Sequence, residues 1–580
     1  MRGVEAARAA KPPAEVLDSQ DANDAPADAA ARTTLALNPM IGLRGSDIIG
    51  AAEVAVRAVV TQPAAAAKTW LSFVGSLANI VSGKADEKPD QRDKRFADPT
   101  WAKSKVHKTL LQTYAALGSA VNDFVEKADL SEVDRQRAKL ASSILIDALA
   151  PSNMLLANPT AVRQIVDTGG ESLIRGANNF VTDLINNGGL PATVDKSKFQ
   201  VGKNLATSEG ACVFRSDMAE LLQFAPRSAE VHSRPLVIVP PQINKYYMLD
   251  LTPDKSLIQY LTGNGFQVFC MSWRNPKPAQ RDWGLESYVE TVDAAVDAAR
   301  AITGSADLNM MGTCSGGITA TSYVGYLAGK GERKVNGLVL AVCVLDMATT
   351  GEMQIGSLIT PETLRAAREA SRLKGVLEGS DLARMFAWMR PNDLIWNYWV
   401  NNYLLGNQPP AFDILYWNAD TTRLPARLHS DYLGMIETNP FVNAGTLVIG
   451  GVKIDLEKVP ALDTYVVAGT TDHITPWKSC YKSARLFGPQ TTFVLSNAGH
   501  LQSILNPPGN PKSFFISGPA NQQNPDAWAA KGDKQSGSWW THWVEWLGKR
   551  SGEKKSSPSI LGNDEFPAIA PAPGTYVYET

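Results

Sequence analysis

Residues 308–317 read Leu-Asn-Met-Met-Gly-Thr-Cys-Ser-Gly-Gly, and they carry the clearest fold signal in the sequence. A short apolar run ends at Gly312, and a sequence compatible with a helix extends over 315–328. The five residues 312–316 have the Gly-x-nucleophile-x-Gly spacing of a strained turn between a strand and a helix, with cysteine where serine is usual. Glycine is required there because side chains two residues from the nucleophile would collide. The helix that follows points its N–H groups at Cys314 and favours a thiolate.

The same five residues also fit a buried structural cysteine beside a tight turn, which is the more common origin of such a match. Two residues further along the chain favour the nucleophile instead. Asp472 lies just past an apolar run in Ala-Gly-Thr-Thr-Asp-His-Ile-Thr-Pro, and His500 follows another run in Ser-Asn-Ala-Gly-His. Nucleophile, acid and base then have the chain order of the α/β-hydrolase triad, and each lies at the carboxyl end of a strand.

The chemistry of these side chains assigns their roles. His500 can take the proton of Cys314 or hold it in an ion pair, and Asp472 can orient the imidazole. The N–H of Ser315 is one expected oxyanion donor. The second is expected from Gln242 or Ile243, after the apolar run 235–239, and Ile243 is our choice.

One competing base has to be weighed. His473 is adjacent to the aspartate, but neighbouring residues of a loop usually point apart, so we favour His500. Cys480 falls in an expected helix between two lysines and is interpreted as a packing or surface thiol.

The bulk composition excludes several function classes. The chain has 580 residues, a net charge of −2 and 44% hydrophobic residues, so it can bury a large core and has no global field for nucleic acid. Its five cysteines are scattered and form no metal-ligand spacing, which suits a reducing cytoplasm and predicts no metal. There is no apolar signal segment, and the longest aliphatic run, 338–345, is too short to span a membrane.

The first part of the chain differs from the rest. Residues 1–32 are rich in Ala, Asp and Pro and are expected to form a disordered tail. Residues 33–200 have helical periodicity, with helices expected over 110–127 and 133–149. One apolar stripe comprises Trp70, Phe73, Val74, Leu77 and Val81. We interpret this stripe as a core-facing helix, and a contact surface for a hydrophobic partner is the alternative.

Residues 201–580 alternate between short apolar runs and helical patterns. Apolar runs without polar alternation predict a parallel sheet covered on both faces. The expected strands are the runs that end at the elbow and those at 235–239, 267–272, 337–345, 461–467 and 492–495. An amphipathic helix is expected over 285–302. The alternation lapses over 346–458, where helical, aromatic sequence predicts a cap over the site, with an ordinary helical subdomain as the alternative.

Two further features lie near the end of the sequence. The tryptophans at 528–546 are interpreted as packing against the domain, and residues 551–580 as a polar tail. The fold class is therefore α/β, an α/β-hydrolase fold with a helical cap, preceded by a mainly helical N-terminal domain.

A cysteine nucleophile narrows the chemistry without fixing it. A thiolate is both a good nucleophile and a good leaving group, so its attack on a thioester exchanges one thioester for another at little thermodynamic cost. Such a site suits acyl transfer from coenzyme A to an alcohol, although hydrolases also use cysteine.

Short motifs throughout the chain carry a family resemblance. They are LNP at 37–39, GLRG at 42–45, DKRF at 93–96, NGGLP at 187–191, PPQINK at 240–245, SWRNP at 272–276, GTCSGG at 312–317, MRPND at 389–393, WNY at 396–398, DHITPW at 472–477, GH at 499–500 and NPPG at 506–509. With these motifs the chain resembles polyhydroxyalkanoate synthases, most closely the class II, medium-chain-length type. The resemblance runs from about residue 35 to the end.

The resemblance implies an acyltransferase that polymerises (R)-3-hydroxyacyl-CoA into polyester and releases CoA through an acyl-cysteine. It places nucleophile, acid and base on Cys314, Asp472 and His500 and implies no cofactor, since CoA is the leaving group. It also implies a homodimer in the cytoplasm at the surface of polyester granules, with granule-associated proteins as candidate partners and without nucleic acid or a transmembrane segment.

Four residues are candidates for substrate binding. Arg390 could pair with the phosphates of CoA, and an ordinary salt bridge is the alternative. Cys343 and Leu501 are expected near the acyl chain, and His473 lies beside the acid. The rival functions are a thioesterase or polyester depolymerase on the same triad, and a non-catalytic protein of the granule surface.

Overall fold

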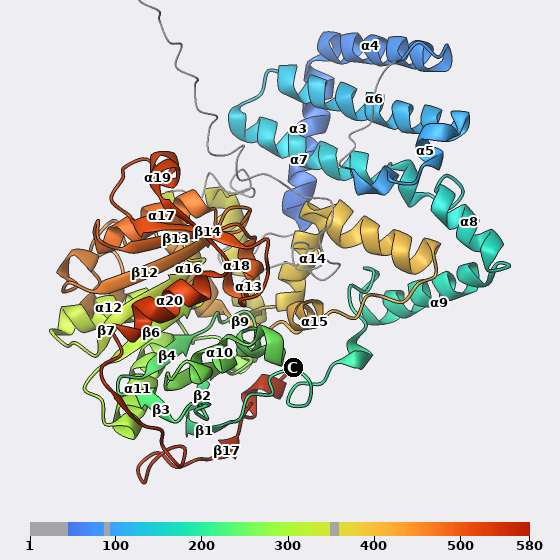
Figure 1. Ribbon diagram of the computed structural model, residues 1–580. Coiled ribbons are helices and arrows are strands. Elements are labelled where there is room, and N and C mark those ends of the chain that lie inside the picture. The colour runs from blue at the N-terminus through green and yellow to red at the C-terminus, as the bar shows by residue number, and fades with distance from the viewer. Residues whose placement is uncertain (1–44, 86–92, 349–358) are drawn as a thin grey trace, which may run out of the picture.

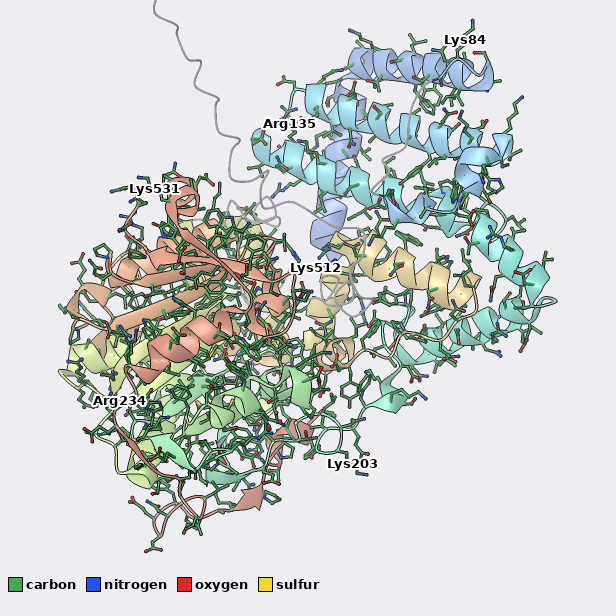
Figure 2. All side chains as sticks on the ribbon, in the orientation of Figure 1. Lys84, Arg135, Lys203, Arg234, Lys512 and Lys531 are labelled. Carbon is green, nitrogen blue, oxygen red and sulfur yellow. The ribbon has the colours of Figure 1, made fainter. Side chains whose placement is uncertain are left out.

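The computed structural model describes residues 45–85, 93–348 and 359–580 and consists of a helical N-terminal part beside an α/β part (Figure 1). The predicted tail at 1–32 lies outside these residues. The basic side chains labelled in Figure 2 are distributed over both parts of the molecule rather than gathered in one patch. Within the described ranges, no helix combines the length and apolar character needed to cross a membrane.

The α/β part is built on one sheet of eleven strands, in the order β15-β14-β13-β12-β7-β6-β4-β5-β2-β1-β17. The six strands from β13 to β5 run parallel, as the apolar runs predicted. These are β4 (Leu236–Val239), β5 (Val268–Trp273), β6 (Leu308–Thr313), β7 (Val335–Ala341), β12 (Asp463–Gly469) and β13 (Thr492–Ser496).

Antiparallel strands extend the predicted parallel sheet at both edges. They are β1 (Gly210–Arg215), β2 (Ala219–Phe224), β14 (Phe514–Pro519), β15 (Asp533–Ser536) and β17 (Ala570–Pro571). Two of these strands, β15 (Asp-Lys-Gln-Ser) and the two-residue β17, are polar or very short and so give no continuous apolar run.

The central strands are buried on both faces because their side chains alternate between two apolar layers. On β6, Met310 faces one layer and Met311 the other. The first layer contains residues of α11 (Leu285–Thr303) and α12 (Ser315–Lys330). The second contains residues of α10 (Leu257–Gly263) and α20 (Trp539–Gly548), including Trp539 and Trp543. The interpretation of these tryptophans as packing residues is therefore confirmed.

The N-terminal part contains α3 (Gly45–Thr61), α4 (Pro63–Val81), α5 (Thr100–Lys103), α6 (Lys105–Lys127), α7 (Glu132–Ala148), α8 (Pro159–Asp167) and α9 (Glu171–Asn186). The interpretation of the α4 stripe as core-facing is wrong for most of its members. Phe73 is buried and Leu77 half-buried, whereas Trp70, Val74 and Val81 are 62%, 44% and 75% exposed. Helical periodicity aligned these side chains, and among the described helices α6 covers part of their face.

The chain between β7 and β12 forms the helical segment that was expected as a cap. It contains α13 (Pro361–Lys374), α14 (Gly379–Met389), the π-helical turns η9 (Asn392–Trp396) and η10 (Trp399–Leu404), α15 (Asp413–Ala419) and α16 (Ala426–Thr438). This segment also contacts the N-terminal part, where the ring of Phe180 on α9 packs edge-on against Tyr403 at 5.3 Å. Figure 1 shows α14 lying between the two parts of the molecule.

The interpretation of residues 551–580 as a tail is wrong. β16 (Lys554–Ser556) pairs with β3 (Glu230–His232), and β17 pairs with β1 at the edge of the main sheet. The helical turn η13 (Tyr576–Tyr578) then packs with its Tyr576 and Val577 side chains buried. Polar composition concealed this docking, which includes hydrogen bonds with residues far away in the sequence.

Candidate active site

The nucleophile elbow forms as the sequence predicted. β6 ends at Thr313, α12 begins at Ser315, and Cys314 between them has φ 49° and ψ −123°, a strained conformation for a side-chain-bearing residue. A Cβ on Gly312 would lie 2.5 Å from the Cα of Gly317, and one on Gly316 would lie 2.1 Å from the backbone oxygen of Val239. The steric reason for glycine at both positions is therefore confirmed.

Asp472 and His500 lie together beyond β12 and β13. The Nδ1 of His500 is 2.7 Å from the Oδ2 of Asp472, and both residues are 6% exposed. The N–H groups of Ile474 and Thr475 donate to Oδ1 at 2.9 Å, and the hydroxyl of Thr475 donates to Oδ2 at 2.6 Å. The carboxylate is thus held by four donors, and its orientation toward the imidazole is fixed.

The electrostatics of this pair favour a charged imidazole. Burial alone lowers the pKa of His500, but the Asp472 carboxylate and a hydrogen bond with Cys314 outweigh it and raise that pKa to about 10. Burial alone would raise the pKa of Asp472, yet the contacts with His500 and Thr475 lower it. Both shifts favour an imidazolium beside the Asp472 carboxylate.

His473 is directed to a different partner. Its Nε2 lies 3.1 Å from an Nη of Arg390, whose other Nη donates to Asp393 at 2.6 Å. Burial and the nearby guanidinium lower the pKa of His473 to about 4, so it is neutral at physiological pH. Arg390 is engaged in an ion pair and a hydrogen bond, and its role toward the phosphates of CoA stays a prediction, as does a substrate role for His473.

The loop after β4 lies between the elbow helix and the helical segment that follows β7. The Oε1 of Gln242 accepts hydrogen bonds from Ser315 Oγ and Tyr432 Oη, each at 2.9 Å. The N–H and hydroxyl of Thr422 donate to the backbone oxygens of Ile243 and Gln242 at 3.0 and 2.6 Å. These contacts fix the loop in place.

The two chosen oxyanion donors have unused N–H groups. Ser315 is the first residue of α12, so its N–H has no acceptor inside the helix. The N–H of Ile243 donates to no other group within the part of the chain that the structure describes. Both groups can therefore serve an oxyanion, and this assignment stays a prediction.

The remaining candidates lie in the apolar layers around the site. Leu501 is buried in the layer against which Cys314 packs, whereas Cys343 is buried in the layer on the opposite face of the sheet. A Cβ on Gly317 would come within 2.6 Å of the Cys343 sulfur. Burial raises the pKa of Cys343 and of Cys480 well above the ordinary value, so both thiols stay protonated. A role of Cys343 or Leu501 toward the acyl chain stays a prediction.

Three supporting residues were missed in the sequence: Thr475, Thr422 and Tyr432. Only Thr475 had a recognisable signal, because an aspartate often accepts hydrogen bonds from backbone N–H groups two and three residues further on. Thr422 and Tyr432 are far from Gln242 in the sequence, and their motifs are unremarkable.

Comparisons with known proteins agree with this geometry. Residues 92–261 match the family described as the N-terminus of poly-beta-hydroxybutyrate polymerase, and residues 235–507 match the α/β hydrolase fold, which confirms the predicted fold class. Two relatives from Ectopseudomonas oleovorans, poly(3-hydroxyalkanoate) polymerases 1 and 2, are 51% and 47% identical. The matches cover 95% of this chain and 98% of the first relative, and 93% and 96% for the second.

A more distant relative is the poly(3-hydroxyalkanoate) polymerase subunit of Cupriavidus necator, 37% identical over 86% of this chain and 85% of that protein. Identity at this level over nearly the whole length decides the family. The elbow, the buried Asp472–His500 pair and these matches together show that the chain belongs to the poly(3-hydroxyalkanoate) polymerase family.

Proposed function

We propose that this protein polymerises (R)-3-hydroxyacyl-CoA into polyester, with Cys314 as the acylated residue. The observation that carries the proposal is the contact of Cys314, held at a strained elbow, with the buried His500–Asp472 pair. The relatives' names, which all describe polymerases of 3-hydroxyalkanoates, supply the substrate class.

In the first step, the Cys314 thiolate attacks the thioester carbonyl of the substrate. The carbonyl oxygen becomes an oxyanion that accepts hydrogen bonds from the N–H groups of Ser315 and Ile243. When the carbon–sulfur bond to CoA breaks, His500 gives its proton to the leaving CoA sulfur. The products are CoA and a hydroxyacyl thioester on Cys314.

In the second step, neutral His500 takes the proton of a 3-hydroxyl group, whose oxygen attacks the acyl-cysteine thioester. An ester bond forms, the thiolate of Cys314 leaves, and the imidazolium beside Asp472 is restored. Medium-chain monomers, a homodimer and a location at the granule surface are parts of this proposal that the class II motifs support.

Purified full-length protein given hydroxyacyl-CoAs of four and ten carbons tests the proposal by measuring CoA release and polymer together. We expect both products, with the ten-carbon substrate preferred, and Cys314→Ala should abolish both. Cys212→Ala, which changes a buried thiol on β1, is the matched control and should retain activity. Free hydroxy acid in place of polymer would instead identify a thioesterase.

A further inference from the structure

We propose that the segment 575–579 is a positioning element for the oxyanion loop, and that it acts through Lys245. This inference rests on the proposed acyl transfer at Cys314 and adds a device that holds one of its oxyanion donors in place. Lys245 lies two residues after Ile243 in the loop that follows β4.

The ammonium group of Lys245 is enclosed by three acceptors from two distant segments. Its Nζ donates to the backbone oxygens of Val577 and Glu579 at 2.6 and 2.8 Å and lies 3.1 Å from an oxygen of Asp420. The side chain is 4% exposed, and three acceptors match the three N–H bonds of an ammonium group. Because a buried ammonium group without partners is costly, these contacts fix the end of the loop.

The backbone of Lys245 is held as well. Its carbonyl oxygen accepts a hydrogen bond from the indole N–H of Trp417 at 2.7 Å, and Trp417 lies on α15 of the cap. At its other end the loop is held by Gln242, as described above. The N–H of Ile243 therefore lies between two anchored residues, one of which depends on the 575–579 segment.

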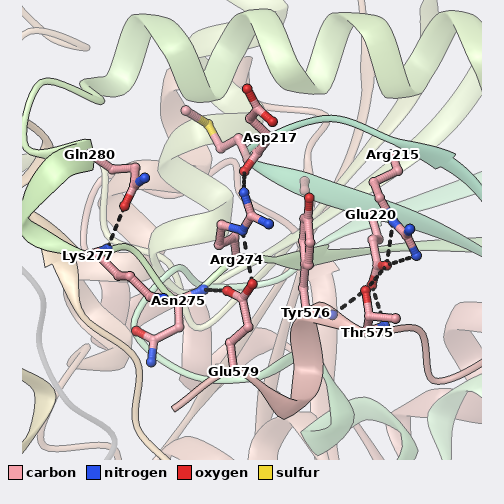
Figure 3. A network of polar contacts seen from close by, with 12 residues as sticks. Arg215, Asp217, Glu220, Arg274, Asn275, Lys277, Gln280, Thr575, Tyr576 and Glu579 are labelled. Atoms are coloured by element: carbon pink, nitrogen blue, oxygen red, sulfur yellow. Dashed lines mark hydrogen bonds and ion pairs between the residues drawn. The ribbon is translucent and has the colours of Figure 1, made fainter.

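The carboxylate of Glu579 links the same segment to the loop after β5. It accepts hydrogen bonds from Arg274 Nε at 3.0 Å and from the N–H of Asn275 at 3.2 Å, as Figure 3 shows. The side-chain oxygen of Asn275 accepts in turn from the N–H of Arg423, just beyond Thr422 of the cap. One short segment thus connects the oxyanion loop, the β5 loop and the base of the cap.

The segment has its own anchor on β2, so it can hold other groups in place. Glu220 is fully buried and accepts from the N–H and hydroxyl of Thr575 and from the N–H of Tyr576, at 2.9, 2.7 and 3.0 Å. Arg215 pairs with the same carboxylate, and the Arg274 guanidinium lies 4.2 Å from the Tyr576 ring centroid. Figure 3 shows these side chains converging on the segment.

The chemical consequence follows from the geometry that an oxyanion hole needs. A donor must lie about 2.7–3.1 Å from the oxyanion, and a displacement of about 1 Å can cost roughly 100-fold in rate. Loosening Lys245 would displace the N–H of Ile243 without changing Cys314, His500 or Asp472. The step that forms the oxyanion would therefore slow down, whereas the reactivity of the Cys314 nucleophile would not change.

The experiment compares Lys245→Met, Glu579→Gln and the control Glu565→Gln in the full-length protein. Glu565 is exposed and outside these contacts, so its variant matches the charge change of Glu579→Gln. For each we would measure kcat and KM for CoA release and the rate at which iodoacetamide alkylates Cys314. Alkylation consumes the same thiolate but forms no oxyanion.

We expect Lys245→Met to lower kcat roughly 10- to 100-fold with KM within about threefold, and to leave the alkylation rate unchanged. Glu579→Gln should lower kcat less, and Glu565→Gln should match the wild type. If Lys245→Met does not fold, Lys245→Gln, which is shorter and uncharged but keeps an N–H donor, carries the test, because Glu579→Gln leaves the backbone acceptor of Lys245 in place. Unchanged kcat in the folded variants, or alkylation that falls in parallel with kcat, would refute the positioning role. Retained activity in Cys314→Ala would instead refute the proposed function, so the two failures are distinguishable.

Discussion

The substitution Asp472→Asn should disable the site by fixing the wrong tautomer of His500. The Oδ1 of Asp472 accepts two backbone N–H groups at 2.9 Å, so the amide oxygen of asparagine must take that place. The amide NH₂ then occupies the place of Oδ2, which is 2.7 Å from the Nδ1 of His500 and 2.6 Å from the Thr475 hydroxyl. It would donate to Nδ1, leaving the proton on Nε2, where His500 has to accept one.

The magnitude follows from two losses. The raised pKa of His500 depends on the Asp472 carboxylate, so the imidazolium would no longer be favoured. An acid-to-amide change that traps the wrong tautomer of a triad histidine costs roughly 10⁴ in kcat, or about 5 kcal/mol. Thr475→Val is the milder comparison variant. It removes one hydrogen-bond donor to the carboxylate, at a cost of about 1.5–3 kcal/mol, and preserves the tautomer of His500.

The assay is single-turnover CoA release with ten-carbon hydroxyacyl-CoA, after circular dichroism has shown that each variant is folded. We expect a loss of at least a thousandfold for Asp472→Asn and roughly ten- to a hundredfold for Thr475→Val. A loss below tenfold for Asp472→Asn, or equal losses for the two variants, would refute the reasoning about the tautomer.

Two further predictions concern packing and pH. Gly317→Ala would place a Cβ 2.6 Å from the Cys343 sulfur, so it should lower the free energy of unfolding by about 1–3 kcal/mol in urea denaturation. Adding Cys343→Ala removes the sulfur but keeps a Cβ at 2.9 Å, so it should recover part of that loss, and equal stability of the single and double variants would contradict the contact. Burial, assisted by Arg368, lowers the pKa of His429 to about 4. As the pH falls, the unfolded chain takes up this proton before the folded protein does. The contribution of neutral His429 to the free energy of unfolding is therefore complete above about pH 6.5 and is lost as the pH falls toward 4. Between pH 7 and pH 5, His429→Gln should therefore lose about 2 kcal/mol less stability than the wild type, and parallel pH profiles would exclude His429 as the titrating group.

The arrangement of the candidate site could be predicted because its signals are local. The parallel strands are apolar runs, and the elbow requires glycines at fixed spacing around Cys314. Asp472 and His500 each follow a strand, and parallel strands bring their carboxyl ends to one edge of the sheet. The choice of His500 over His473 rested on the expectation that the side chains of adjacent residues, here Asp472 and His473, point apart. The structure pairs His500 with Asp472.

The supporting structure could not be predicted because its partners are far apart in the sequence. The contact of Lys245 with Val577 spans 332 residues, and nothing near either residue indicates the other. The edge strand β15 is polar and is held by its pairing with β14. On α4 the local pattern was visible but its burial was not. Helical periodicity aligned Trp70 and Val81 without determining whether another helix covers them, and both are exposed.

Mass spectrometry of the peptides can show whether Cys314 is the residue that is acylated. The protein would be incubated with an acyl-CoA that lacks the 3-hydroxyl group, so that the acyl-enzyme forms and has no alcohol with which to extend. We predict one equivalent of CoA released in a burst and an acyl adduct on the peptide that contains Cys314, absent from Cys314→Ala. An adduct on Cys343, Cys480 or a serine would show that Cys314 is not the acylated residue. Undiminished release of CoA by Cys314→Ala would show the same.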